Sequence, residues 1–203
     1  RDPWEFASTG TRPDKTLPVA TVLTLAASGS ETSNSCVLTN EETKEKRGIT
    51  SETNRPVISF LNPEDTFTVS KFQTGCGIVD IMMHTLERYL TPEGGESDLT
   101  DRIAEGLLIA VRDAGRRAIA DPRDYEARAT LMWAGSVSHN DYTGCGRKRL
   151  FPVHKLEHEL SAFRDEIAHG AGLSVLFPAW AEHEMQYDYP RFAQFANRVL
   201  GVE

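Results

Sequence analysis

The 203-residue sequence has few cysteines and no apolar run long enough to cross a membrane. Its three cysteines, Cys36, Cys76 and Cys145, are far apart and odd in number, which argues against the disulfide framework of a secreted protein. The longest nearly apolar run, from Gly170 to Ala181, contains Pro178 and is too short to span a bilayer. We therefore expect a protein of the reducing cytoplasm that has no membrane partner.

The sequence also lacks an excess of positive charge, internal repeats and low-complexity tracts. Lys and Arg total 22 against 30 Asp and Glu, giving a formal net charge of -8, and the basic residues are scattered among acids. We therefore expect no nucleic-acid partner. The length is sufficient to bury a substantial core. The chain begins with Arg1, not with methionine, so we expect an internal fragment of a longer protein.

Short strands are expected in the first third of the chain. Leu17–Leu25 is apolar and β-branched, as a buried strand is, and it runs into small residues, Ala26–Glu31, that would let the backbone approach a ligand. Val37–Thr39 and Val57–Leu61 are further strand candidates, separated by a charged turn over Asn40–Arg47.

From Lys71 onward, apolar residues recur at helical spacing, as Ile78, Met82 and Leu86 do. The joint between the two parts is expected between Leu61 and Lys71, giving an α/β part over residues 1–65 and a helical domain over 66–203. The further predicted helices run from Asp98 through Val111, over Asp124–His139, Val153–Phe163, Gly170–Tyr187 with a kink at Pro178, and Pro190–Leu200.

The predicted helix from Lys71 carries a DxxxH pair, Asp80 and His84. Positions four apart lie on one helical face, with Cβ atoms roughly 5–6 Å apart, so both side chains can bind one ion. The surrounding residues are apolar, and an unpaired buried carboxylate would be costly. A metal ion removes that cost, and a buried Asp–His hydrogen bond is the structural alternative.

Four of the six histidines, His154, His158, His169 and His183, crowd the last third of the chain. An ion that already binds Asp80 and His84 needs two more nitrogens. One of His154, His158 and His169 is therefore left over. His154 and His158 lie four apart, and a purely structural pair on a polar helix face would show the same spacing. Imidazole suits zinc and iron, and the carboxylate extends the choice towards iron(II) or manganese.

Five segments together resemble the iron-containing, or group III, alcohol dehydrogenases, and in particular their butanol dehydrogenase and broad aldehyde reductase branch. They are TLAASGSE, GCGIVDIMMHTLERYL, DRIAEGLL, DYEARATLMWAGS and HKLEHELSAFRDEIAHGAGLSVLFPAW. The resemblance implies a mainly α fold, in which an all-helical metal-binding domain, incomplete at its C-terminus, follows a small α/β remnant of a dinucleotide-binding domain. This is a truncated form of the dehydroquinate synthase-like fold.

By this resemblance, the ligands of an Fe(2+) or Zn(2+) ion match Asp80, His84, His154 and His169. His158 matches a residue beside the nicotinamide and is a candidate catalytic proton relay. The implied reaction transfers a hydride between NAD(H) or NADP(H) and a short-chain aldehyde such as butanal, and the implied assembly is a homodimer of the full-length form. The cofactor contacts implied at matching positions are Thr24, Leu25, Ser28, Ser35 and Lys46, of which Lys46 has a solvated surface charge as its alternative.

Two other functions fit the metal residues alone. Asp/His sites also activate water, so a metal-dependent hydrolase or lyase is one alternative. A metal-binding helical fragment without catalytic activity is the other. The strand followed by the TLAASGSE loop favours the dehydrogenase, because a hydrolase has no need of a nucleotide-binding loop.

Overall fold

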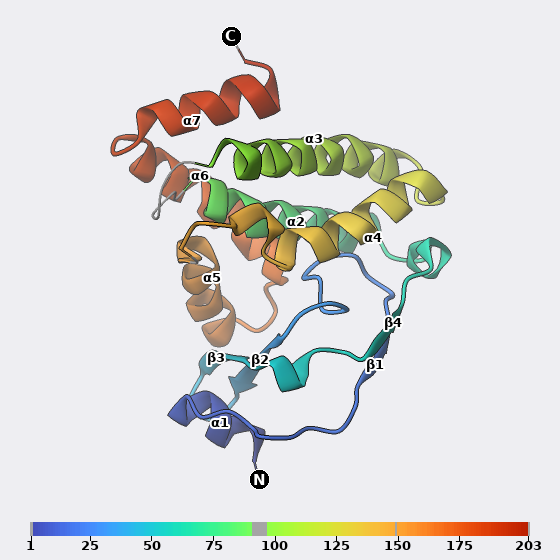
Figure 1. Ribbon diagram of the computed structural model, residues 1–203, viewed down its shortest axis with the longest axis vertical. Helices are drawn as coiled ribbons and strands as arrows, with labels where there is room; N and C mark the ends of the chain where they lie inside the picture. The colour runs from blue at the N-terminus through green and yellow to red at the C-terminus, as the bar shows by residue number, and fades with distance from the viewer. Residues whose placement is uncertain (1, 91–96, 149, 203) are drawn as a thin grey trace.

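The structure is a computed structural model that describes residues 2–90, 97–148 and 150–202. Its strands lie together with the N-terminus at one end of the molecule, and its longer helices and the C-terminus lie at the other (Figure 1). This arrangement confirms the expected fold class, a small α/β part that precedes a larger helical part. Within the described residues, no helix has both the length and the apolarity needed to cross a lipid bilayer.

The α/β part contains two separate two-stranded sheets. One is parallel and pairs β1 with β4, with Ala20 opposite Ile58. The other is an antiparallel hairpin of β2 and β3, with Ser35 opposite Thr50. The elements of this part are α1 (Pro3–Thr9), β1 (Ala20–Val22), β2 (Ser35–Asn40), β3 (Glu45–Thr50), η1 (Glu52–Asn54), β4 (Ile58–Phe60) and η2 (Pro63–Thr66).

Two strand expectations were wrong in detail. The strand expected over Leu17–Leu25 is shorter and is not buried, since β1 pairs with β4 alone among the described strands and Leu17 is 85% exposed. The charged segment Asn40–Arg47 is not all turn, because its last residues belong to β3. Charged side chains alternate to the open side of a hairpin at little cost, so charge alone did not exclude a strand there.

The predicted helices are present. The element η2 lies in the expected joint, and the boundary at residue 65 stays a prediction. Ser97, Asp124 and Asp188 cap α3, α4 and α7 by accepting backbone N–H groups, as their sequence positions favour. The helical elements are α2 (Lys71–Leu90), α3 (Asp98–Ala120), α4 (Tyr125–His139), η3 (Tyr142–Gly144), α5 (Pro152–Phe163), α6 (His169–Met185), α7 (Tyr189–Phe195) and a π-helical turn, η4 (Ala196–Leu200).

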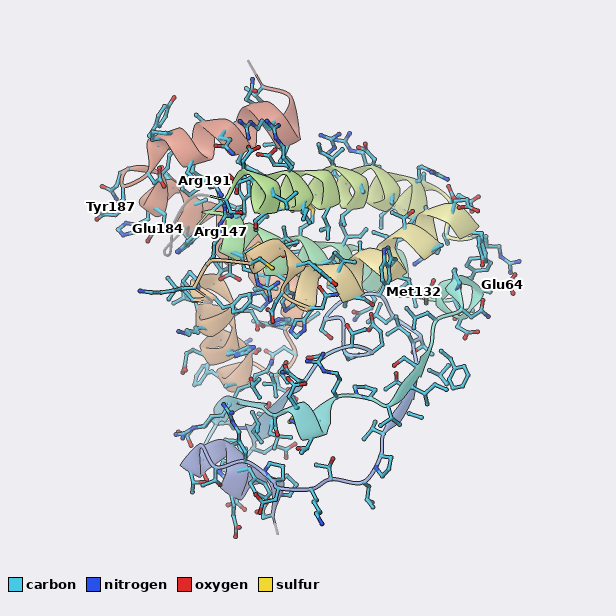
Figure 2. All side chains as sticks on the ribbon, in the orientation of Figure 1. Glu64, Met132, Arg147, Glu184, Tyr187 and Arg191 are labelled. Carbon is cyan, nitrogen blue, oxygen red and sulfur yellow. The ribbon has the colours of Figure 1, made fainter. Side chains whose placement is uncertain are left out.

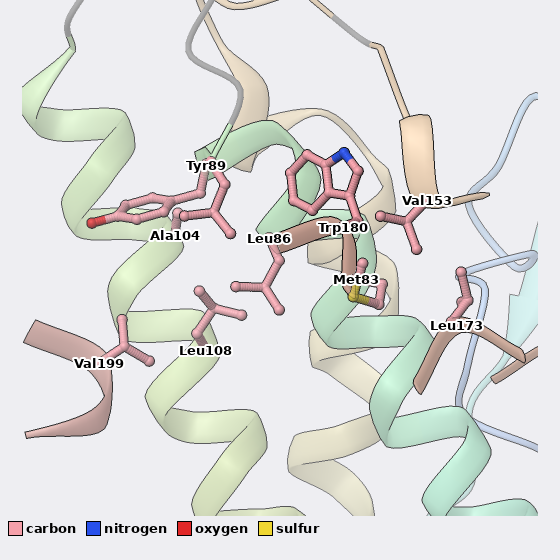
Figure 3. Packing of buried hydrophobic residues seen from close by; sticks show 10 residues of the cluster. Met83, Leu86, Tyr89, Ala104, Leu108, Val153, Leu173, Trp180 and Val199 are labelled. Carbon is pink, nitrogen blue, oxygen red and sulfur yellow. The ribbon is translucent and has the colours of Figure 1, made fainter. Parts of the chain in front are cut away.

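Helix α2 lies at the centre of the helical part because it is buried on more than one side. On one side, Leu86 and Tyr89 of α2 meet Leu108 of α3 and the Trp180 side chain of α6 in one apolar cluster (Figure 3). On another side, Ile81 packs in a second cluster with residues of α3 and α4. A helix fixed by packing on several sides is a rigid platform for the polar residues that it carries.

Glycines let two other segments approach this platform closely. A Cβ atom added at Gly170 would lie 2.1 Å from the carbonyl oxygen of Cys76, so the first turn of α6 touches the backbone of α2. A Cβ atom at Gly77 would lie 2.2 Å from the carbonyl oxygen of Ala26. The small-residue loop after β1 is thus in direct contact with α2, and only a residue without a side chain fits at either contact.

A buried ionic cluster joins α7 and the segment before α5 to α3. Asp101 of α3 accepts hydrogen bonds from Arg191 of α7 at 2.5 and 2.6 Å and from Arg147. The two arginines approach each other at this end of the molecule (Figure 2). Burial would raise the pKa of Asp101, but the bonds from Arg191 and Arg147 lower it to about 2.

We predict that Gly170→Ala destabilises the protein by about 1–3 kcal/mol, because the new methyl group must push α6 away from α2. The matched control is Gly106→Ala in α3, where nothing lies within 4 Å of the added Cβ atom. That control should stabilise the helix by roughly 0.5–1 kcal/mol. Urea unfolding followed by circular dichroism measures both, and equal effects of the two substitutions would contradict the close contact.

We predict that Asp101→Asn lowers the free energy of unfolding by about 3–5 kcal/mol near neutral pH, because it leaves two buried arginines without their carboxylate. The folded-state pKa of Asp101 lies below its ordinary value of 3.8, so its contribution is present above that value and is lost as the pH falls towards 2. The difference between wild type and variant should therefore shrink over this pH range. Asp98→Asn, at an exposed acid, is the control and should show little difference at any pH.

Candidate metal centre

Helix α2 places Asp80 and His84 one turn apart in a buried position. Their side chains are 5% and 8% exposed. The ring of His84 turns back along the helix, and its Nδ1–H donates to the backbone carbonyl of Asp80 at 2.9 Å. The predicted helix and the predicted shared face of the DxxxH pair are confirmed.

Helices α5 and α6 bring His154 and His169 to the same carboxylate. Asp80 Oδ1 lies 3.3 Å from His84 Nδ1, 3.5 Å from His154 Nε2 and 3.7 Å from His169 Nε2. Three helices that are up to 89 positions apart in the sequence thus converge on one oxygen atom. The close packing at Gly170 explains the approach of His169, since it lets α6 begin directly against α2.

In His154 and His169 the nitrogen that lies away from Asp80 is bonded to an acceptor. His154 Nδ1 donates to Glu87 Oε2 and His169 Nδ1 donates to Glu157 Oε2, while His84 Nδ1 donates to the carbonyl of Asp80. Carboxylates and carbonyls only accept, so each Nδ1 carries the hydrogen. In the neutral form of each ring, Nε2 is therefore the lone-pair nitrogen, which is the form that binds a metal.

Two of the inner atoms have no hydrogen-bond partner among the described residues, Asp80 Oδ1 and His154 Nε2. Leaving buried polar atoms unpaired costs free energy, and a cation among these atoms would remove the cost. Ligand atoms of Asp80, His154 and His169 lie within 4.8 Å of one another. One carboxylate oxygen and imidazole nitrogens are a donor set that suits a divalent transition ion, so the residues fit the metal that the sequence predicts.

The pKa values of the site show how strongly its charges interact. Burial would raise the pKa of Asp80, but the imidazoles around it lower it to about 2. Burial lowers the pKa of His84 to about 3, so this ring is neutral. Burial would also lower the pKa of His154, but the carboxylates of Asp80 and Glu87 raise it to about 9. An incoming ion must displace the proton of His154, which makes metal binding pH-dependent.

His158 lies beside this group. Its ring is 5.5 Å from that of His169 and 6.5 Å from that of His154, and burial, with the charge of Lys46, lowers its pKa to about 4. A second set of donors, Glu157, His158 and His169, also lies within 4.8 Å. It shares His169 with the first set, and its Glu157 Oε2 is already bonded to that ring.

A cavity of about 860 Å³ opens onto the imidazoles. Ser28 and Ser35, predicted as cofactor contacts, line it, and so does Lys46 of β3. Thr24 and Leu25 are exposed residues after β1 and are not among the residues that line the cavity. The structure thus brings three of the five predicted contacts to the imidazoles, and the cofactor roles of all five stay predictions.

Four residues of this site were not predicted from the sequence. Glu87 and Glu157 each follow a site histidine by three positions, so an acid on the buried face of a histidine-bearing helix was the signal. His139 of α4 gave no local signal, and its ring lies 4.7 Å from that of His84. Phe151, at a φ of 48°, lines the cavity with its ring 5.3 Å from that of His154.

Comparison with known proteins identifies the family. Residues 74–203 match the C-terminal profile of the Fe-containing alcohol dehydrogenase family, and residues 2–63 match the profile named iron-containing alcohol dehydrogenase. The chain belongs to the iron-containing alcohol dehydrogenase family. Both the helical part and the α/β part are covered, in agreement with the resemblance seen in the sequence.

Among relatives, the NADH-dependent butanol dehydrogenase A of Clostridium acetobutylicum is 41% identical over 203 residues, which are 100% of this chain and 52% of that protein. The NADPH-dependent aldehyde reductase YqhD of Escherichia coli is 33% identical over 99% of this chain and 52% of its own length. The crystal structure of NADH-dependent butanol dehydrogenase A from Thermotoga maritima superposes with a TM-score of 0.94 at 38% identity, covering 98% of this chain and 50% of that one. The chain therefore spans about half the length of the relatives that it matches.

We predict that Asp80→Ala and His154→Ala abolish stoichiometric binding of iron or zinc, because each removes a donor and leaves charged or polar atoms buried. His158→Ala should retain the ion, and His183→Ala, at a histidine outside both donor sets, is the control. Metal content after dialysis, measured by mass spectrometry, is the readout. Loss of the ion from His158→Ala with retention in Asp80→Ala would assign it to the second donor set.

Proposed function

We propose that the protein is a metal-dependent alcohol dehydrogenase that transfers a hydride between NAD(P)H and a short-chain aldehyde such as butanal. The observation that carries this proposal is the buried oxygen of Asp80 with three imidazoles around it, beside a cavity large enough for a small substrate and the end of a cofactor. The family membership and the names of the relatives support the same reaction.

We propose that Asp80, His84, His154 and His169 hold the ion. The donor set suits both Fe(2+) and Zn(2+), and the family name favours iron. When bound, the ion supplies a Lewis acid that stabilises the negative charge on the carbonyl oxygen as hydride reaches the carbon. Asp80 and the rings are rigidly held, because each belongs to a helix packed in the core, and this preorganisation limits the cost of positioning a substrate.

His158 is the residue proposed to move the proton. Its lowered pKa keeps the ring neutral near pH 7, so one ring nitrogen carries a hydrogen and the other can accept one. The ring lines the cavity next to His169. It is therefore placed to give a proton to the alcohol oxygen, directly or through a linked water, and to recover one from solvent.

The proposed cofactor contacts lie on the strand side of the cavity. Ser28 and Ser35 offer hydroxyls, and Thr24 and Leu25 lie at the start of the loop that reaches α2. Several butanol dehydrogenase relatives, at 37–41% identity, are named for NADH, and one aldehyde reductase at 33% is named for NADPH. These names favour NADH for this protein.

Cys36, Cys76 and Cys145 are all free, as thiols are in the reducing cytoplasm, where we propose that the protein acts. The homodimer stays a prediction. A metal-dependent hydrolase or lyase is disfavoured by the family, and a fragment that binds metal without turnover is distinguished from an enzyme by the assay below.

We predict that the purified, iron-loaded protein oxidises NADH in the presence of butanal, and that it shows no comparable hydrolysis of p-nitrophenyl butyrate. His158→Gln should lower kcat by about 10²–10⁴-fold, because the proton relay is lost, while the bound metal remains. Absorbance at 340 nm follows the reaction. Stoichiometric metal with no turnover of any short-chain aldehyde would favour the metal-binding fragment instead.

A further inference from the structure

The two carboxylates behind the histidine ligands are held in different ways. Glu87 is fixed by the backbone, because its Oε1 accepts the N–H groups of Val153 at 2.5 Å and His154 at 3.2 Å. Glu157 has no such support, and its Oε1 has no hydrogen-bond partner among the described residues. Its side chain is nevertheless completely buried. A buried carboxylate in this position needs another means of orientation.

Space for Glu157 is provided by a glycine of α6. A Cβ atom added at Gly172 would lie 2.8 Å from Glu157 Cγ and 3.1 Å from Oε1. The same helix carries His169, three residues earlier, whose Nδ1 bonds to Glu157 Oε2. The missing side chain at Gly172 thus lets the Glu157 carboxylate lie flat against α6 and reach the ring.

A positive charge near Glu157 comes from Lys46 in the β2–β3 hairpin. Lys46 of β3 donates to Ser161 Oγ at 2.9 Å, and Ser161 lies one helical turn after Glu157 on α5. The Ser161 hydroxyl accepts from Lys46, so its own hydrogen is available to a neighbouring carboxylate. Lys46 is separated from Ser161 by 115 positions in the sequence, so this contact joins the α/β part to the helical part.

We infer that Glu157 is a positioning residue that holds His169 for the metal, and that Ser161 and Lys46 link it to the hairpin lining the cofactor side of the cavity. The inference rests on the proposed metal site. It gives Lys46 a role different from the nucleotide contact predicted from the sequence. It also makes metal affinity sensitive to the position of the hairpin, because a shift of β3 would withdraw the cation that supports Glu157.

The test measures binding of Co²⁺ by visible absorption and thermal unfolding of the metal-free protein. Glu157→Gln should weaken Co²⁺ binding about 10- to 100-fold, as loss of an outer carboxylate does at other metal sites. Glu159→Gln, an exposed acid two positions later on α5, is the matched control and should bind as wild type does. Ser161→Ala and Lys46→Met should weaken binding by less than Glu157→Gln, and Lys155→Met, at another cavity lysine, should have no effect.

The outcomes separate this inference from the proposed function. Wild-type protein that binds no Co²⁺ would overturn both. If wild type binds Co²⁺, and Glu157→Gln binds it as tightly as the Glu159→Gln control does, the inference alone is overturned. Reduced affinity in Glu157→Gln, with metal-free unfolding temperatures unchanged, supports the positioning role, since a merely structural residue would lower stability without a specific effect on binding. If Ser161→Ala binds Co²⁺ as tightly as wild type does, the link to the hairpin is overturned even if Glu157 holds His169.

Discussion

The structure depends on one electrostatic constraint, a carboxylate oxygen of Asp80 that is buried without a hydrogen-bond partner among three imidazoles. Such an arrangement is costly unless a cation shares it. The packing of the helical part brings these groups together. Helix α2 is fixed by two apolar clusters, and glycines at its contacts let the ligand-bearing helix α6 approach its backbone.

Around this centre, carboxylates and imidazoles alternate in layers. The imidazoles meet Asp80 on the inside and the carboxylates of Glu87 and Glu157 on the outside. Because the outer carboxylates fix a hydrogen on Nδ1 of His154 and His169, these two rings turn Nε2 towards Asp80, whereas His84 turns Nδ1 towards it. The cavity then begins where this polar centre ends, and it is bounded by the hairpin and by the loop after β1. Metal, substrate and cofactor would therefore meet at the junction of the α/β and helical parts.

The sequence predicted the helices and the shared face of Asp80 and His84 well, because both have strong local signals: helical spacing from Lys71 onward, and two polar residues four apart in an apolar helix. The choice of His154 and His169 as further ligands came from the resemblance to the family and not from spacing. It predicted β1 poorly, since a run of β-branched residues reports strand propensity but not which neighbours will cover the strand. The spacing places Glu87 and Glu157 three positions after site histidines, but the partners of Glu87, Glu157 and Lys46 could not be read from the sequence. Each acts across helices or between the two parts of the fold, and spacing along one element carries no information about such contacts.

The account is tested most directly by locating the ion itself. Crystals of the iron- or zinc-loaded protein, measured at the absorption edge of the metal, should show one anomalous peak per chain, within bonding distance of a carboxylate oxygen of Asp80 and of Nε2 of His154 and His169. A peak bounded instead by Glu157 and His158, or no peak in protein that folds normally, would contradict it.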